Sequence, residues 1–317
     1  MERQKIRHVK AWGRNKSYIA EFTQIRPLTN VFFHFLLFIF AASCIIPVLL
    51  IISISVSDEN FIQLHGYSLI PKQVSLKAYT FIFMKGSEIL NSLFNSVLVT
   101  AAGTALSIFL TTTMGYVLSR YEYRLHKFYS WLMFLPMVFG GGMVASYFIN
   151  TQFLHFHNTL WILFVPGAMG TFNCIICRTF FRSNVPDAIV DSAKMDGASQ
   201  FTIFFRLIMP VSLPLIATIG LFASFGLWND WFTPFLYIGR QDLYTLQALL
   251  YKYLRDIQKL TENLSVSGVS ALEMALKLPK EGARMAIVVL VVVPITCVYP
   301  FFQRYFITGL TIGAVKE

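Results

Sequence analysis

Residues 27–57 read PLTNVFFHFLLFIFAASCIIPVLLIISISVS and contain no Asp, Glu, Lys or Arg. Four more windows lack these charged residues, and they lie at 89–119, 128–177, 207–229 and 285–303. The five windows cover 154 of the 317 residues. A transmembrane helix needs about 20 apolar residues, whereas the strands of a membrane β-barrel show about ten residues of alternating polarity. These continuous runs of Leu, Ile, Phe and Val therefore predict an all-α integral membrane protein.

The windows predict six transmembrane helices, which makes the protein polytopic. The 50-residue window is too long for one crossing, and the polar stretch 150–158 divides it into two. The predicted spans are 31–53, 94–118, 129–149, 159–179, 208–228 and 286–306. Only 13% of the residues are charged, against about 25% in soluble domains. The composition therefore excludes an ordinary cytosolic enzyme, a secreted disulfide scaffold and a disordered chain.

The charges of the connecting segments orient the spans. With the N-terminus inside, the inner segments carry 16 basic and 7 acidic residues, and the outer segments carry 10 basic and 9 acidic residues. Because Lys and Arg accumulate in cytoplasmic loops, we expect both termini in the cytoplasm. The net charge of +10 then reflects this topology and attraction to anionic lipid headgroups, and it gives no reason to expect nucleic acid as a partner.

This orientation divides the chain into three parts. We expect a cytoplasmic N-terminal segment at 1–30, a transmembrane domain at 31–306 and a cytoplasmic tail at 307–317. The transmembrane domain carries a cytoplasmic loop at 183–208 and an extracytoplasmic loop at 229–285.

Motifs for catalysis and for metal binding are missing from the sequence. It contains no GxxxxGK[ST] phosphate loop, no HExxH and no GxSxG. His155 and His157 in a short outer loop, and Cys174 and Cys177 in a span, are the candidate metal ligands. Such pairs are more often solvated histidines and small apolar fillers, so we expect no metal and no catalytic residue. Any uphill transport must then draw its energy from another polypeptide.

The loop 183–208 predicts two short amphipathic helices joined by a turn. Asn184, followed by Pro186, is a plausible N-cap of the first helix, and Gly197 suits the positive φ of a helix end. Ser199 is the predicted N-cap of the second helix. The residues expected on the apolar faces are Val185, Ala188, Ile189 and Ser192 in the first helix and Phe201, Phe204, Phe205 and Ile208 in the second.

The sequence of this loop resembles a known motif. Residues 191–198 read DSAKMDGA and are followed by Pro210, which is similar to the EAA motif (EAA-x-x-DGA) of binding-protein-dependent ABC importer permeases. Asp191 stands where that family has its first Glu, and Ser192 stands where it has its first Ala. Further segments resemble the carbohydrate branch, the MalG-like permeases of the LplC/YtcP type, and they lie at 115–120, 178–181, 228–231, 300–306 and 313–316.

The resemblance implies a type I ABC importer permease (MetI-like) fold and a non-catalytic membrane subunit for oligosaccharide import by alternating access. It implies a second homologous permease, two ATPase subunits that use ATP and Mg, an extracytoplasmic solute-binding protein and a bacterial cell membrane. This chain itself would bind no cofactor. The residues that would couple to the ATPase are Asp191, Ser192, Ala193, Asp196, Gly197, Ala198, Phe201, Arg206 and Pro210.

Four residues after the fifth span are candidates for contact with the substrate or the binding protein, and they are Trp228, Asn229, Trp231 and Tyr237. An aromatic belt at the membrane interface is an alternative explanation for the rings.

Two alternatives to the function also remain open. The same fold can move a non-sugar solute, such as an amino acid, phosphate or a metal chelate. Less consistent with the sequence is a channel or a membrane-embedded enzyme, since the spans lack a polar catalytic cluster.

Overall fold

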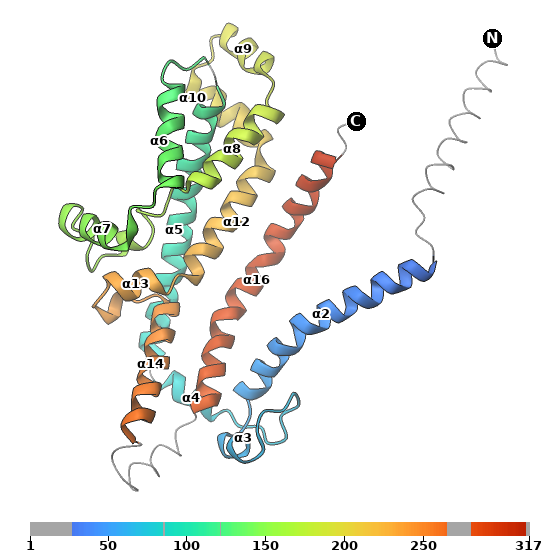
Figure 1. The fold of residues 1–317 in the computed structure, drawn as a ribbon, viewed down its shortest axis with the longest axis vertical. Helices are drawn as coiled ribbons and strands as arrows, with labels where there is room; N and C mark the ends of the chain where they lie inside the picture. The colour runs from blue at the N-terminus through green and yellow to red at the C-terminus, as the bar shows by residue number, and fades with distance from the viewer. Residues whose placement is uncertain (1–26, 85, 121, 265–279, 315–317) are drawn as a thin grey trace, which may run out of the picture.

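The computed structural model describes residues 27–84, 86–120, 122–264 and 280–314 (Figure 1). These residues form helices and no strand, apart from one isolated bridge between Ser57 and Val74, so the all-α prediction is confirmed. Parts of the predicted segments 1–30, 229–285 and 307–317 lie outside the described residues.

The helices follow the charge-free windows, with short helices between them. The first half of the chain forms α2 (Pro27–Ser55), α3 (Glu59–His65), α4 (Lys77–Phe83), α5 (Gly86–Ser119), α6 (His126–Val138), α7 (Gly142–Phe148), the π-helix η1 (Ile149–Phe153) and the 3-10 helix η2 (Leu160–Leu163). The second half forms α8 (Thr171–Asn184), α9 (Asp187–Met195), α10 (Gln200–Thr202), the π-helix η3 (Ile203–Ile208), α11 (Met209–Val211), α12 (Leu213–Asn229), α13 (Phe232–Tyr237), the 3-10 helix η4 (Gln241–Leu243), α14 (Leu246–Leu264) and α16 (Lys280–Ala314).

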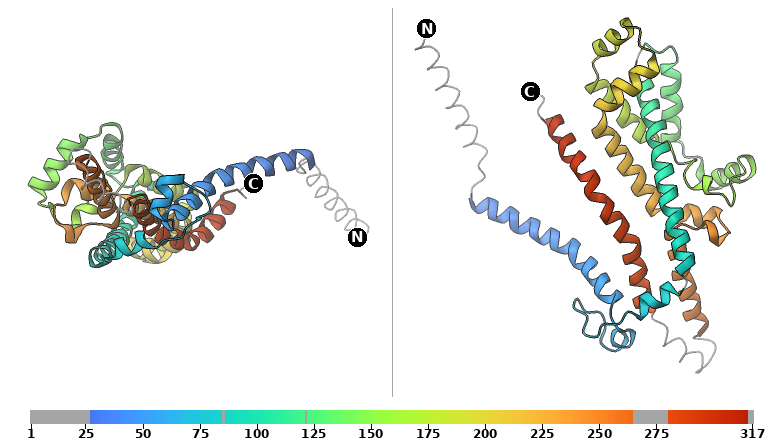
Figure 2. Two further views of the ribbon diagram at one scale, coloured as in Figure 1. Left: turned by 90° about the horizontal axis from the view of Figure 1, so that it is seen from below. Right: turned by 180° about the vertical axis from the view of Figure 1, so that it is seen from behind.

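The long helix α5 is the centre of the bundle, and α8 and α12 pack along it (Figures 1 and 2). Two glycines of α5 allow this close approach. A Cβ at Gly115 would collide with the side chain of Cys177 in α8, and a Cβ at Gly103 would lie 2.6 Å from Cδ1 of Leu227 in α12. Small residues let membrane helices pack backbone to backbone, and here they fix α5 between its two neighbours.

Helices α2 and α5 contain the predicted spans 31–53 and 94–118, and both are long and apolar enough to cross a membrane. Two bent helix pairs raise the number of candidate spans in the described residues to four at most. The predicted span 286–306 falls within α16. The count of six therefore stays a prediction.

The prediction of one continuous helix over 129–149 is wrong. The chain breaks after Val138, and α6 makes an angle of 118° with the following helix that begins at Gly142. Three consecutive glycines, 140–142, cause the break, because glycine weakens a helix and tolerates positive φ. The helix α6 ends before Phe139, whose backbone is extended, and Gly142, with a φ of +76°, redirects the chain into α7.

The predicted span 159–179 is α-helical only in its second half. A 3-10 turn over 160–163 precedes an irregular stretch that contains Pro166, Gly167 and Gly170, and α8 begins at Thr171. Proline removes a helical hydrogen bond and glycine adds conformational freedom, so an apolar composition alone did not make this stretch a helix.

Candidate functional site

The loop 183–208, called here the EAA-like loop, lies at the end of the bundle opposite to α14 (Figure 1). It contains the end of α8, then α9, α10 and η3. Two helical segments joined by a turn at Gly197 were predicted, and the structure confirms them.

The turn between the two segments has the hydrogen bonds of a Schellman motif. Gly197 has a φ of +80°, its N–H donates to the carbonyl of Lys194, and the N–H of Ala198 donates to the carbonyl of Ala193, both at 3.0 Å. An added Cβ at Gly197 would meet no atom within 4 Å. Backbone conformation, rather than space, therefore calls for glycine at this position.

The predicted start and buried face of the first helix are wrong. Asn184 belongs to α8, where its amide donates to the carbonyl of Phe180, and α9 begins at Asp187 after Pro186. In α9 the buried residue is Val190, whereas Ile189, which was expected on the apolar face, is exposed.

The predicted cap of the second helix is confirmed, because Ser199 Oγ accepts a hydrogen bond from the N–H of Thr202 at 3.2 Å. Its predicted apolar stripe is only half correct. Phe204 and Ile208 are buried, but Phe201 and Phe205 are exposed. The cause is the π-helix η3, whose i→i+5 hydrogen bonds change the periodicity that an α-helix would have.

Pro210 marks the point where the EAA-like loop joins α12. Proline has no N–H and its ring clashes with the carbonyl four residues earlier, which explains why the chain here is π-helical rather than α-helical. The segment Gln200–Val211 meets α12 at an angle of 84°. At the bend the N–H of Ser212 is shared between the carbonyls of Ile208 and Met209, each at 3.1 Å.

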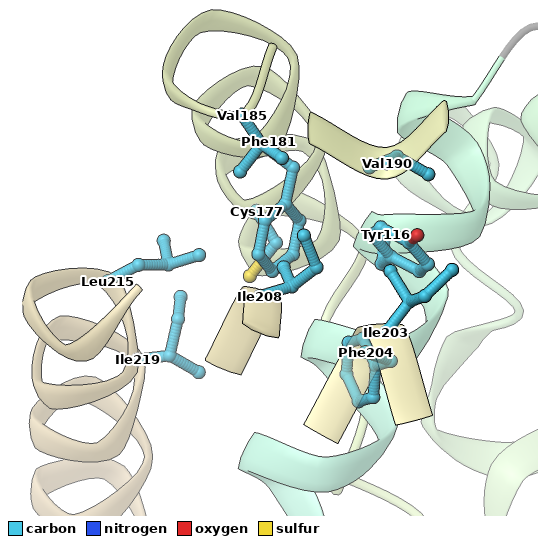
Figure 3. Packing of buried hydrophobic residues seen from close by; sticks show 10 residues of the cluster. All are labelled: Tyr116, Cys177, Phe181, Val185, Val190, Ile203, Phe204, Ile208, Leu215 and Ile219. Atoms are coloured by element: carbon cyan, nitrogen blue, oxygen red, sulfur yellow. The ribbon is translucent and has the colours of Figure 1, made fainter. Parts of the chain in front are cut away.

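One apolar cluster fixes the EAA-like loop on the bundle (Figure 3). Its buried members come from α5, α8, α9, η3 and α12, and they are Tyr116, Cys177, Phe181, Val185, Val190, Ile203, Phe204, Ile208, Leu215 and Ile219. The ring of Tyr116 lies 5.9 Å from that of Phe181 and 5.3 Å from that of Phe204. Because protein interiors are close-packed and resist deformation, this cluster joins the EAA-like loop firmly to α5, α8 and α12.

Ion pairs between distant segments also hold α9 in place. Arg120, at the end of α5, pairs with Asp187 at the start of α9. Lys194 Nζ lies 3.1 Å from a carboxylate oxygen of Glu122 and 3.1 Å from one of Asp191. The hydrogen bonds that Lys194 donates to Asp191 and Glu122 raise the pKa of Lys194, so this side chain stays protonated at neutral pH.

The surface of the EAA-like loop is exposed at most of the residues that the motif singled out. Ala193 and Ala198 pack against the apolar cluster, whereas the exposed ones are Asp191, Ser192, Asp196, Gly197, Phe201, Arg206 and Pro210. Phe201 is 78% exposed and Met195 89% exposed. Sequence reasoning did not single out Met195 as a site residue, although a large apolar side chain directly before the Asp-Gly turn was a usable signal.

A cavity of about 370 Å³, the central cavity, lies farther along the bundle. Its polar lining comes from α5, η1, α8, α13 and the link between α12 and α13, and the residues are Ser107, Asn150, Asn173, Asp230, Thr233 and Tyr237. The amide of Asn150 donates to the hydroxyl of Tyr237 at 3.2 Å. The residues that line the cavity include no Lys, Arg or His. Sequence reasoning found only Tyr237, because the chain breaks at 139–141 and 164–170 bring the asparagines to the cavity.

Comparison with known proteins identifies the family. The model of the family described as binding-protein-dependent transport system inner membrane component matches residues 103–312. The chain belongs to this family.

Among curated relatives of this permease, the polygalacturonan/rhamnogalacturonan transport system permease protein YtcP of Bacillus subtilis (strain 168) is 35% identical over 88% of this chain and 95% of its own length. Protein LplC of the same organism is 34% identical over 87% of this chain and 90% of its own length. The predicted relationship to carbohydrate ABC permeases of the LplC/YtcP type is confirmed.

The permease fold is confirmed by a solved structure. A chain of a bacterial ABC transporter involved in the import of the acidic polysaccharide alginate superposes with a TM-score of 0.75 at 24% identity, over 90% of this permease and 100% of that chain.

The four candidate contact residues, two at the end of α12 and two beyond it, have different surroundings in this permease. The indole of Trp228 is buried and donates to the carbonyl of Val291 in α16 at 3.2 Å. Asn229 donates to the carbonyl of Phe225 in its own helix and accepts from Gln247 in α14. The ring centre of Trp231 lies 4.3 Å from that of Tyr251 in α14, with the ring planes tilted by 32°. Of the four, Tyr237 lines the central cavity.

His155 and His157 are not joined by further metal ligands among the described residues. His157 Nδ1 lies 3.1 Å from the amide of Asn158, and Asn158 Oδ1 accepts from the N–H of Gly239 at 2.6 Å. In the described part of the permease, no three His, Cys, Asp or Glu side chains are arranged to hold a metal ion.

Proposed function

We propose that this permease is one of the two membrane subunits of an ATP-driven, solute-binding-protein-dependent importer of oligosaccharides. The observation that carries the proposal is the EAA-like loop, an exposed and rigid element whose buried side packs on α5, α8 and α12 at once. YtcP is named for a polysaccharide transport system, and the alginate transporter imports a polysaccharide, which supports a saccharide as the solute.

The proposed partners divide the work of transport. A second homologous permease completes the pathway, and an extracytoplasmic solute-binding protein delivers the saccharide. Two ATPase subunits bind ATP and Mg and contact the exposed face of the EAA-like loop, chiefly Met195 and Phe201. Both termini of this permease and the EAA-like loop lie in the cytoplasm of a bacterial cell, as the distribution of Lys and Arg favours.

The transport cycle follows from the packing. When ATP brings the two ATPase subunits together, they displace the EAA-like loop, and the cluster around Phe181 transmits the displacement to α5, α8 and α12. These helices also border the central cavity, through Ser107, Asn173 and Phe222. The displacement therefore changes access to the cavity, and hydrolysis of ATP reverses it.

The central cavity suits the hydroxyl-rich surface of a saccharide. The amides of Asn150 and Asn173 and the carboxylate of Asp230 line it together with hydroxyl groups, and such groups exchange hydrogen bonds with sugar hydroxyls. Its volume of about 370 Å³ lies within the range of small-molecule sites, roughly 300–1,000 Å³.

The test uses the complete transporter in proteoliposomes. Replacing Met195 and Phe201 together with Asp is expected to reduce both the recovery of the ATPase subunits with the tagged permease and the ATP-dependent uptake of labelled oligosaccharides. Leu64→Asp is the matched control, because Leu64 is also highly exposed but lies in α3 at the opposite end.

Three outcomes contradict the proposal. The first is normal ATPase recovery and normal uptake in the Met195 and Phe201 variant. The second is solute flux that does not depend on ATP, which indicates a channel. The third is ATP-dependent uptake of an amino acid, phosphate or a metal chelate with no uptake of saccharides.

A further inference from the structure

A second cavity lies between α13 and α14, at the end of the bundle opposite to the EAA-like loop, and the transport cycle described above makes no use of it. Its volume is about 170 Å³. Three aromatic rings and three basic side chains line it, and they belong to Phe235, Tyr244, Tyr251, Lys252, Arg255 and Lys259. We refer to it as the α14 groove.

The three basic residues form one row on α14. Lys252, Arg255 and Lys259 are separated by three and four residues, the spacing of neighbours on one face of a helix. Among the residues whose side chains the structure describes, which exclude those of 260–264 in α14, none of the three forms an ion pair with a carboxylate within 4.0 Å. Asp256 is the one carboxylate that lines the groove, so the groove has an excess of two positive charges.

Aromatic rings position these cations without neutralising them. The guanidinium carbon of Arg255 lies 5.1 Å from the ring centre of Phe235 and 5.9 Å from that of Tyr251. Lys252 Nζ lies 5.8 Å from the ring centre of Tyr244. Cation–π contacts orient a basic group while its full charge is kept, so the groove offers positive charge beside apolar faces.

Two other basic residues of this end of the bundle are paired. Arg240 forms two hydrogen bonds with Asp242, at 3.1 and 2.6 Å, and Arg284 lies 3.5 Å from Glu281. The basic row of α14 therefore differs from Arg240 and Arg284, whose charges are neutralised by carboxylates.

We propose that the α14 groove binds a carboxylate-bearing sugar residue, a uronic acid, of the saccharide that enters the transporter. This inference rests on the proposed function and names the substrate class. A sugar ring presents a C–H face to an aromatic ring, and a uronic acid places a carboxylate at its edge. Arginine binds carboxylates through two parallel hydrogen bonds, and the positive row attracts anionic chains before they reach the central cavity.

The size of the groove indicates how much of the saccharide it holds. A volume of about 170 Å³ is below the usual range for drug-sized ligands, roughly 300–1,000 Å³. The groove therefore accommodates a single sugar residue of a longer chain. Its concave, ring-lined shape favours a sugar over the flatter acidic surface of a docking protein.

The experiment compares two probes that differ only in charge, trigalacturonate and its fully methyl-esterified form. The complete transporter, with its partner permease, ATPase subunits and binding protein, is reconstituted in proteoliposomes at low ionic strength. The variant replaces Lys252, Arg255 and Lys259 with Gln. We expect its initial uptake rate for trigalacturonate to fall about tenfold or more, the lower limit of electrostatic steering, and its rate for the ester to stay unchanged.

Two controls separate this effect from misfolding. Arg240→Gln removes a paired cation of the same surface and is expected to leave both uptake rates unchanged. The ATPase activity of the triple variant, stimulated by the loaded binding protein, must equal that of the unmodified transporter. A second measurement is binding of trigalacturonate to the transporter without binding protein, followed by the fluorescence of Trp231, which stacks on Tyr251 beside the groove.

The outcomes test the carboxylate site in the α14 groove separately from the proposed ATP-driven import of saccharides. Equal losses for both probes, or no loss for trigalacturonate, overturn the α14 groove as a carboxylate site while ATP-driven saccharide uptake stands. Loss of stimulated ATPase activity in the triple variant assigns the groove to docking of the binding protein and also overturns the inference. ATP-dependent uptake of neither probe nor any other saccharide by the unmodified transporter refutes the proposed function itself.

Discussion

The two ends of the molecule use charged residues in opposite ways. At the EAA-like loop, Arg120 and Lys194 pair with carboxylates that lie 67 and 72 residues away in the sequence. At the α14 groove, Lys252 and Arg255 contact aromatic rings and no carboxylate within the described residues. Charge at the first end fixes the position of a loop within the chain. Charge at the second end remains available to a molecule from outside.

The largest effect is expected from Gly197→Val in the EAA-like loop. A left-handed backbone costs about 1–2 kcal/mol for a residue with a Cβ, and a β-branched side chain raises the cost further, so the turn rearranges. We expect ATP-dependent uptake to fall to background while the permease still assembles in the membrane.

Gly197→Asn is the matched control for this change, since Asn adopts the left-handed region readily. It should retain more uptake than the Val variant. Equal activity of the Val variant and the unmodified transporter would show that the loop does not depend on its turn.

A smaller effect is expected from Arg120→Gln. The Arg120 side chain is only 17% exposed and lies 5.2 Å from the ring of Tyr116, so its loss loosens both the ion pair with Asp187 and the packing below. We expect ATP hydrolysis to continue while fewer saccharides are taken up per ATP, by about tenfold for a loss of about 1.4 kcal/mol. The ratio of uptake to hydrolysis measures this. An unchanged ratio would mean that the ion pair does not serve coupling.

Uptake that depends on the α14 groove should be more sensitive to salt than uptake that depends on the EAA-like loop alone. Raising the ionic strength shortens the Debye length from about 30 Å at 0.01 M to about 8 Å at 0.15 M, and unpaired exposed charges are affected most. We expect the uptake of trigalacturonate to decline several-fold over this range and the uptake of its methyl ester to change little. Equal salt dependence of the two probes would show that the unpaired basic residues of the α14 groove do not affect uptake.

The smallest effect is expected from Arg240→Gln. Hydrogen bonds from Arg240 lower the pKa of the Asp242 carboxyl, so their contribution is complete at neutral pH and is lost as acid protonates Asp242. Both groups are exposed, and exposed ion pairs contribute little. Thermal unfolding at pH 7 should therefore change by no more than about 1 °C, and the difference should vanish in acid. A larger shift would place Arg240 in the structural core of this end.

Local chemistry made part of this structure predictable. The charge-free windows indicated α2 and α5, Gly197 indicated a helix end with positive φ, and Ser199 indicated a cap. Each of these features depends on residues that are adjacent in the chain, so the sequence carries the signal directly.

The features that the sequence did not reveal depend on distant residues. The pairing of Arg120 with Asp187 requires the end of α5 to meet the start of α9. The α14 groove requires Phe235 of α13 beside Arg255 of α14. A charge-free window also does not tell a continuous helix from a broken one, which is why the breaks at Gly140 and Pro166 were missed.

The segment Gln200–Val211 meets α12 at an angle of 84°. A displacement along the axis of this segment is therefore directed almost perpendicular to the axis of α12. Helix α12 carries Phe222, Ala223 and Gly226 along one wall of the central cavity. In the proposed transport cycle, a small displacement of Gln200–Val211 therefore moves α12 across the central cavity and alters the width of that cavity.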